Sequence, residues 1–276
     1  MAITAADVNK LRQDTGAGMM DCKNALVEAN GDFEAAIDIL RKKGQKVAAK
    51  RADRDSNEGR VLARTSADNK FGAVLMINCE TDFVAKNGEF IAFADSIMDA
   101  AMSNQIKNKE DLLALSLNGR AIVDLLTDMT GKTGEKVECG RYGVIEAPYV
   151  VAYNHNGNRL ATVVGYNKVA ENIAEAGYDV AMQVAAMSPI ALDETSVPQA
   201  TIDHELELAR EITRQEGKPE GMIEQIAQGK LKKFFKENTL VHQDFIKDNK
   251  KSVAQYLTDV DKDLKCTGFV RLQLGA

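Results

Sequence analysis

The chain has 276 residues, of which 45% are hydrophobic and 28% are charged, and its formal net charge at pH 7 is −6. This length allows two or three small domains, and the composition is that of a soluble globular protein. The excess of acidic residues disfavours stable nucleic-acid binding, because phosphate recognition needs dense Lys and Arg. No run of 18 apolar residues occurs, so we expect no membrane span. Residues 1–7 lack the basic and apolar regions of a secretory signal.

The cysteines and histidines also narrow the possibilities. The four cysteines form no C-x-x-C pair, and the three histidines show no ligand spacing with them. We therefore predict reduced, mostly buried thiols in a cytoplasmic protein, and no metal site. The cysteines are Cys22, Cys79, Cys139 and Cys266.

The N-terminal pattern predicts three short helices. Residues 11–26 comprise the end of a helix, a Gly-rich turn and the start of a second helix, and Gly16 and Gly18 both suit a reversal with positive φ. Residues 30–32 break the second helix, and we expect Gly44 to end the third. The resulting bundle resembles the ubiquitin-associated domain.

A run of basic residues follows the bundle. Residues 41–54 hold seven Lys and Arg side chains, and residues 53–59 are polar and turn-rich, which predicts the first domain boundary. One interpretation is a solvated linker whose first charges favour the helix C-terminus. The other is attraction to an acidic partner surface, or transient contact with RNA.

The middle of the chain contains an internal duplication. Residues 69–78 resemble residues 158–167, and each segment is followed by a helix ending in a similar Ala-Met-Ser sequence. Residues 60–65 and 71–79 predict one pair of strands, and residues 140–151 and 158–167 predict another. The intervening residues 67–70 and 154–158 are typical of hairpin turns, so we expect antiparallel sheets.

A helical hairpin is predicted late in the chain, at about residues 200–238. One helix has an apolar stripe of Ile202, Leu206, Ala209 and Ile212, and a Gly-Lys-Pro turn at residues 217–219 precedes a second apolar helix. Residues 266–274 predict a last strand that returns to the second sheet.

The most informative segment is residues 80–87. It follows the predicted buried strand at 71–79, and strand ends often present side chains to a partner. The competing interpretation is that Thr81 or Asp82 only caps a following helix and that Phe83 belongs to the core. The second copy of the duplication has no Asp-Phe pair at the equivalent place. A purely structural role would favour such a pair in both copies, so the difference favours a functional one.

No catalytic group can be assigned. Gly131-Lys132-Thr133 looks like the end of a phosphate loop, but Leu126 stands where that loop needs glycine. Residues 16–18 hold half of a dinucleotide fingerprint, without a preceding strand. No Ser or Cys has a convincing His partner. We therefore expect neither covalent chemistry nor a cofactor.

Together, residues 11–26 and 78–86 resemble the signature motifs of the elongation factor Ts family, the guanine-nucleotide exchange factors of elongation factor Tu. Their order and separation fit the family. The similarity continues downstream and covers nearly the whole chain, at residues 140–144, 181–186, 229–234 and 267–271.

The resemblance implies a function and assigns residues to it. The chain would bind elongation factor Tu with GDP and promote its exchange for GTP by disturbing the Mg²⁺ and phosphate site. Thr81, Asp82, Phe83 and Val84 would cause the disturbance. Further partner contacts would come from the set Arg12, Met19, Met20, Gln183 and Ile246.

Some parts of this assignment leave alternatives open. Core filling is the competing role for at least one of the two methionines. Gln183 stands where many relatives have histidine. The sequence stops at Ala276, without the further C-terminal helix of some members. A homodimer or a 2:2 complex through the helical hairpin is a further alternative.

The predicted fold is α+β. A three-helix ubiquitin-associated-like bundle with its basic linker spans residues 1–54, and core subdomains follow at 55–139 and 140–276, the second containing the hairpin. Two other functions stay possible. The first helices alone suit a ubiquitin- or peptide-binding module, and the basic run suits an RNA- or ribosome-binding protein.

Overall fold

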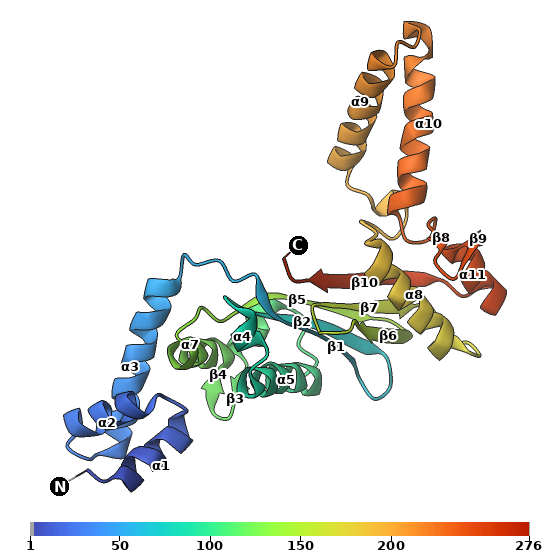
Figure 1. Ribbon diagram of the computed structural model, residues 1–276. Helices are drawn as coiled ribbons and strands as arrows, with labels where there is room; N and C mark the ends of the chain where they lie inside the picture. Colours follow the sequence, from blue (N-terminus) through green and yellow to red (C-terminus); the bar gives the residue numbers. More distant parts are fainter. Residues whose placement is uncertain (1–2, 276) are drawn as a thin grey trace. The chain divides into compact units, whose positions relative to one another are not determined.

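The computed structural model describes residues 3–275 and shows three helices followed by small sheets with packed helices (Figure 1). The predicted α+β class is therefore confirmed. The chain forms two compact units. One comprises the residues up to Leu62, Leu75–Gly143 and the residues from Leu272 onward. The other comprises Ala63–Val74 and Val144–Arg271.

The N-terminal bundle consists of α1 (Ala5–Thr15), α2 (Met19–Glu28) and α3 (Phe33–Arg51). Thr4 starts α1 with a capping box: its hydroxyl accepts the Asp7 N–H, and the Asp7 carboxylate accepts the Thr4 N–H. Apolar side chains from all three helices close the bundle core. They are Val8, Leu11, Cys22, Ala25, Leu26 and Ala36.

The turn between α1 and α2 has one of the two expected left-handed glycines. Gly16 ends α1 with φ of +66°, as predicted. Gly18 has φ of −60° and precedes α2 in an extended conformation, so the prediction for this residue is wrong. A single left-handed residue is enough to reverse the chain here, because Gly18 only has to act as the N-cap.

The third helix does not end at Gly44. It continues to Arg51, so the first part of the predicted basic linker is helical. Gly44 is buried against Gly131 of α7 (Ile122–Thr133). A Cβ atom on Gly131 would lie 2.6 Å from the Gly44 Cα. Because neither residue has a side chain, the two helix backbones approach closely, and this packing outweighs the poor helix propensity of glycine.

The first sheet has the strand order β1-β2-β5, formed by β1 (Glu58–Thr65), β2 (Phe71–Cys79) and β5 (Glu138–Glu146). The central strand, β2, is buried along its whole length. The predicted β1–β2 hairpin is confirmed, with Asn69 at φ of +53° in its turn. The proposed domain boundary between residues 139 and 140 lies within β5.

Between β2 and β5 the chain is mostly helical. The one-turn helix α4 (Asp82–Ala85) leads into α5 (Gly88–Ser103) and α6 (Lys109–Ala114). The short strands β3 (Ser116–Leu117) and β4 (Arg120–Ala121) then pair antiparallel before α7. One face of α5 is buried, through Phe90, Ala94, Ile97, Met98 and Ala101.

The second sheet repeats the arrangement of a hairpin followed by a helix. Strands β6 (Tyr149–Asn154) and β7 (Leu160–Tyr166) pair antiparallel, and α8 (Ile173–Met187) packs on both. The predicted hairpin is confirmed, and the strand of each predicted copy, β2 or β7, is followed by a helix, α5 or α8. The single strand predicted over 140–151 is wrong, because two residues separate β5 from β6, and one of them is Pro148, which has no N–H to donate.

The strand β10 (Cys266–Gln273) completes this sheet in the order β10-β7-β6, as predicted. A small ladder of β8 (Asp244–Phe245) and β9 (Asp248–Ser252) precedes α11 (Val253–Val260). The core of this unit combines residues of the sheet with α8 and α11, and Tyr166 is fully buried, with its hydroxyl donating to the Gly177 carbonyl.

The predicted helical hairpin is present. After a 3-10 turn at Glu194–Ser196, α9 (Gln199–Gln215) and α10 (Glu220–Asn238) run side by side (Figure 1). Arg210 on α9 donates to Glu224 on α10 across the pair. The predicted stripe on α9 is only partly right, because Thr213 is buried where Ile212 was expected.

The glycine contact between α3 and α7 gives a matched pair of substitutions. We expect Gly131→Ala to lower the melting temperature, since overpacking of a close contact costs about 1–3 kcal/mol, more than the gain in helix propensity. Gly44→Ala is the control, because a Cβ there would lie 3.6 Å from the Gly131 Cα, an ordinary contact. Equal melting temperatures for both variants in calorimetry would contradict the close packing.

Candidate partner-binding surface

Thr81 turns the chain from the end of β2 into α4. Its hydroxyl oxygen accepts the Val84 N–H at 3.5 Å, so the capping role considered for Thr81 is real. Asp82 is the first residue of the helix rather than its cap.

Phe83 projects into solvent with 83% of its surface exposed. The alternative that it belongs to the core is therefore wrong. Val84, the next residue, is half-buried. Exposing a whole aromatic ring forgoes about 1.5–3 kcal/mol of burial, which favours a role in binding over one in folding.

Asp82 lies beside Phe83 as a fixed negative charge. Lys86, one turn later, donates to its carboxylate at 2.6 Å. This hydrogen bond, with the lysine charge, lowers the pKa of Asp82 below its ordinary value, so the carboxylate stays ionised at neutral pH.

Two carboxylates fix the chain around Thr81 by joining residues 80–81 to residues 135–136. Glu135 accepts from the Thr81 hydroxyl at 2.6 Å and from the Thr81 N–H at 3.0 Å. In return, Glu80 accepts the Lys136 N–H at 2.7 Å and the Arg51 guanidinium at 2.8 Å. We call these four bonds the Glu80–Glu135 clamp.

A buried thiol lies next to this clamp. The Cys79 S–H donates to the Thr81 carbonyl at 3.2 Å. Burial, and then the charge of Glu135, raise the pKa of Cys79 to about 12, so the thiol stays protonated. It acts as a structural donor and not as a nucleophile.

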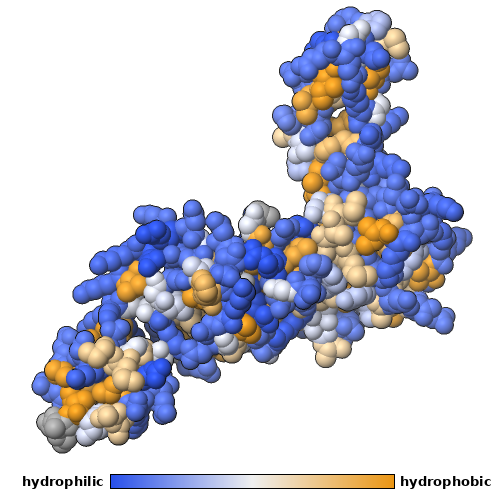
Figure 2. All heavy atoms as spheres, in the orientation of Figure 1, coloured by the Kyte–Doolittle hydropathy of each residue, from blue (hydrophilic) through white to orange (hydrophobic). Residues whose placement is uncertain are grey.

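The N-terminal signature segment also presents apolar side chains. Met19 and Met20, at the start of α2, are 54% and 62% exposed, so the alternative that one of them fills the core is wrong. Arg12 on α1 is exposed as well. Apolar side chains are visible on the surface of the N-terminal helices in Figure 2. Methionine is flexible and polarisable, which suits an adaptable interface.

The structure brings the two signature segments together at one groove of about 440 Å³. Arg12 and Met19 line it from the bundle, and Val84 and Phe90 line it from the segment after β2. The Lys132 side chain of α7 lies so close to Gly16 that a Cβ atom on residue 16 would clash with it. The same lysine pairs with Glu89 at 2.8 Å. Sequence reasoning named both segments but did not predict that they meet.

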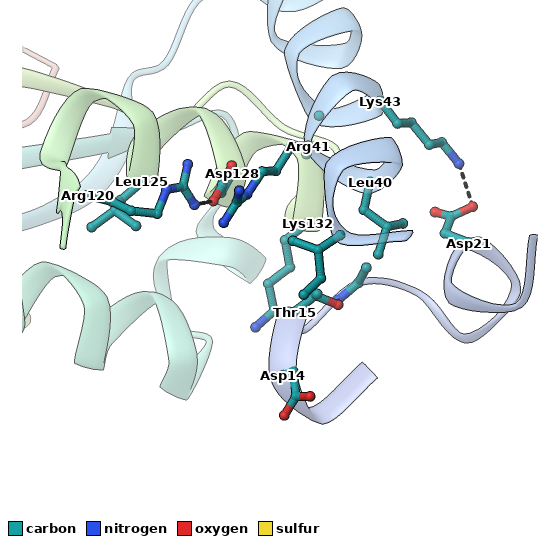
Figure 3. A pocket seen from close by; sticks show the side chains of 14 residues that line it. Asp14, Thr15, Asp21, Leu40, Arg41, Lys43, Arg120, Leu125, Asp128 and Lys132 are labelled. Atoms are coloured by element: carbon teal, nitrogen blue, oxygen red, sulfur yellow. Dashed lines mark hydrogen bonds and ion pairs between the residues drawn. The ribbon is translucent and has the colours of Figure 1, made fainter. Parts of the chain in front are cut away.

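A second hollow, of about 310 Å³, lies between the bundle and α7 (Figure 3). Its charged side chains are largely paired with each other. Lys43 bonds to Asp21 across the bundle, and Arg120 bonds to Asp128 on α7. Because these cations are already neutralised, the hollow does not resemble an anion-binding site.

Several side chains of the predicted basic run form ion pairs with acidic residues of the chain. Arg41, Lys43 and Arg51 pair with Asp38, Asp21 and Glu80, respectively. These pairs leave less uncompensated positive charge than the sequence suggests, which weakens the interpretation of the run as an RNA-binding patch.

The two candidate residues of the second unit differ in exposure. Ile246, between β8 and β9, is 43% exposed, whereas Gln183 on α8 is fully buried. The Gln183 side-chain oxygen accepts the Ile246 N–H at 2.8 Å, and its amide donates to Gln243 and Asp244. Gln183 therefore holds the turn that carries Ile246 and does not reach the surface itself.

Sequence reasoning missed the residues that support these exposed side chains. Glu135 is 54 positions beyond Thr81 in the sequence, so no local pattern links them. Asp179 is similar: it is buried on α8 and bonds to Lys247 at 2.6 Å and to the Tyr256 hydroxyl at 3.0 Å.

Over residues 3–275, no helix combines the length and apolar composition that a transmembrane span requires.

Comparison with known proteins identifies the family of the chain. The family model described as "Elongation factor TS" matches residues 80–276. The chain is 54% identical to elongation factor Ts of Christiangramia forsetii over 273 residues, 99% of each chain. It is 53% identical to that of Flavobacterium psychrophilum with the same coverage, and 51% identical to that of Porphyromonas gingivalis over the full length of both chains. The chain therefore belongs to the elongation factor Ts family and is a translation elongation factor.

Proposed function

We propose that this chain binds elongation factor Tu with GDP and accelerates GDP release, so that GTP can replace it. The observation that carries the proposal is Phe83, an exposed aromatic ring on a one-turn helix, beside the ionised Asp82. Membership of the family supports the choice of partner. This function belongs in the cytoplasm, where translation takes place.

The proposed acceleration of GDP release needs no covalent chemistry and no cofactor bound to this chain. In translational GTPases the phosphates and Mg²⁺ supply much of the hold on the nucleotide. A protein that binds the nucleotide-free GTPase more tightly than the GDP-bound GTPase weakens GDP binding, and the two ratios of affinity are equal. Faster release by about 10⁴-fold corresponds to about 5.5 kcal/mol.

Residues 81–84 would produce this difference between the two states. Phe83 would insert beside a helix of the GTPase domain, where a large apolar group displaces packed side chains. Asp82 would bring a negative charge towards the polar network that surrounds Mg²⁺. Thr81 and Val84 would hold the turn at its two ends.

The other exposed side chains would supply affinity. Met19 and Arg12 on the bundle line the same groove as Val84, and the exposed Met20 follows Met19 directly, so the two segments would contact one continuous partner surface. Ile246 on the second unit would hold the partner at another place, with Gln183 acting through it.

Phe83→Ala is expected to lower the maximal rate of GDP release by at least tenfold, because it removes the inserted group. Its melting temperature should be unchanged, since exposed substitutions usually alter stability by less than about 0.5 kcal/mol. Stopped-flow release of a fluorescent GDP analogue measures the rate. Val123→Ala, at another exposed apolar residue of the same unit, is the control. A normal maximal rate for Phe83→Ala would refute the proposed insertion.

Met20→Ser and Ile246→Ser should act on affinity instead. Each is expected to raise the half-saturating concentration of the factor several-fold and to leave the maximal rate nearly unchanged. Val169→Ser, at a side chain 65% exposed and outside the proposed surface, should change neither value. If all three variants shift the half-saturation alike, the surface has been wrongly assigned.

The helical hairpin is proposed to set the stoichiometry. Leu208 on α9 and Met222 on α10 are exposed apolar side chains that a second copy of the chain would cover in a homodimer or a 2:2 complex. The double variant Leu208→Ser, Met222→Ser should then have a lower mass by light scattering, alone or with elongation factor Tu. An unchanged mass would exclude the hairpin as that contact.

A further inference from the structure

The exposure of Phe83 raises the question of what fixes its position. A side chain that is 83% exposed is not held by packing, so the backbone of residues 81–84 must orient it. That backbone forms a single helical turn, and helices so short are unstable without external support. The Asp82–Lys86 pair at the surface contributes little.

The Glu80–Glu135 clamp provides the missing support. Three of its bonds join the end of β2 to the residues after α7, the fourth joins it to Arg51 of α3, and all involve partly buried groups. Bonds to ionised carboxylates are about twice as strong as neutral ones. The Thr81 hydroxyl connects the clamp to the helix, because it donates to Glu135 and accepts the Val84 N–H.

We propose that Glu135, together with Glu80, is a positioning residue for nucleotide exchange: the clamp sets the direction in which Phe83 leaves the domain. Neither carboxylate is expected to contact the partner or the nucleotide. This inference rests on the proposed function, because it assigns a role to the support of the proposed inserting residue.

Glu135→Gln is the most direct test. Glutamine keeps the size of the side chain and one acceptor oxygen, but its NH2 group only donates, so the side chain cannot accept both the hydroxyl and the N–H of Thr81 through separate oxygens. We expect the maximal rate of GDP release to fall by about tenfold, with little change in half-saturation. Glu110→Gln, on the exposed surface of α6, is the matched control. If Glu135→Gln folds poorly, Glu80→Gln is the substitute test. It weakens the other half of the clamp and should also lower the maximal rate of GDP release.

A double-variant cycle separates positioning from a general loss of structure. If Glu135 acts through Phe83, Glu135→Gln should cause no further loss in the Phe83→Ala background. A tenfold loss in that background as well would overturn the proposal, because the carboxylate would then act by another route.

A measurement on the free protein tests the clamp without the partner. The backbone N–H groups of residues 84–86 bond within the α4 turn. Their hydrogen exchange should become about tenfold faster in Glu135→Gln, while Glu110→Gln leaves it unchanged. Unchanged exchange in Glu135→Gln would refute the clamp. If the wild-type chain fails to accelerate GDP release, the proposed function fails, and this measurement still decides whether Glu135 holds the turn.

Discussion

The close contact between Gly44 and Gly131 is the constraint on which the first unit depends. It lets α3 and α7 approach to backbone distance, and it thereby fixes the N-terminal bundle against the segment that follows β2. This packing places Arg12 and Met19 of the bundle beside Val84 at one groove. A contact between two residues without side chains is thus the basis for the exposed surface. Its specificity is steric, since any side chain on Gly131 would hold the helices apart.

The exposed groups share one arrangement, in which buried or partly buried polar side chains hold short, otherwise weak segments. Glu135 and Glu80 do this for the turn that carries Phe83. Gln183 does it for the turn that carries Ile246. Each supporting group accepts a backbone N–H: Glu135 accepts that of Thr81, Glu80 that of Lys136, and Gln183 that of Ile246. Such groups fix a local geometry at a small net cost, because a buried polar group is tolerated when it is fully bonded.

Local patterns were sufficient to predict most elements but not their junctions. The alternation and turns of the duplicated hairpins, and the apolar stripes of the late helices, follow from periodicities of two and 3.6 residues. Gly44 was misjudged as a stop, because its role depends on Gly131, 87 positions later. The strand predicted over 140–151 failed at Pro148. For the candidate surface, residues 81–84 were found from their contrast with the second copy, whereas Glu135 and the burial of Gln183 depend on long-range contacts that no local pattern contains.

The unbroken third helix has a further consequence. Its 19 residues span about 28 Å at 1.5 Å per residue, from the bundle core to the guanidinium of Arg51 at the clamp. A flexible linker at Gly44 would have let the bundle and the turn of Phe83 bind as two tethered ligands, each with its own loss of orientational freedom. Under the proposed function, a stiff helix would make them one ligand with two contacts, so that binding of the methionines would raise the effective concentration of the ring at its target. The bundle would then orient the ring, and its affinity would contribute to the step at the nucleotide.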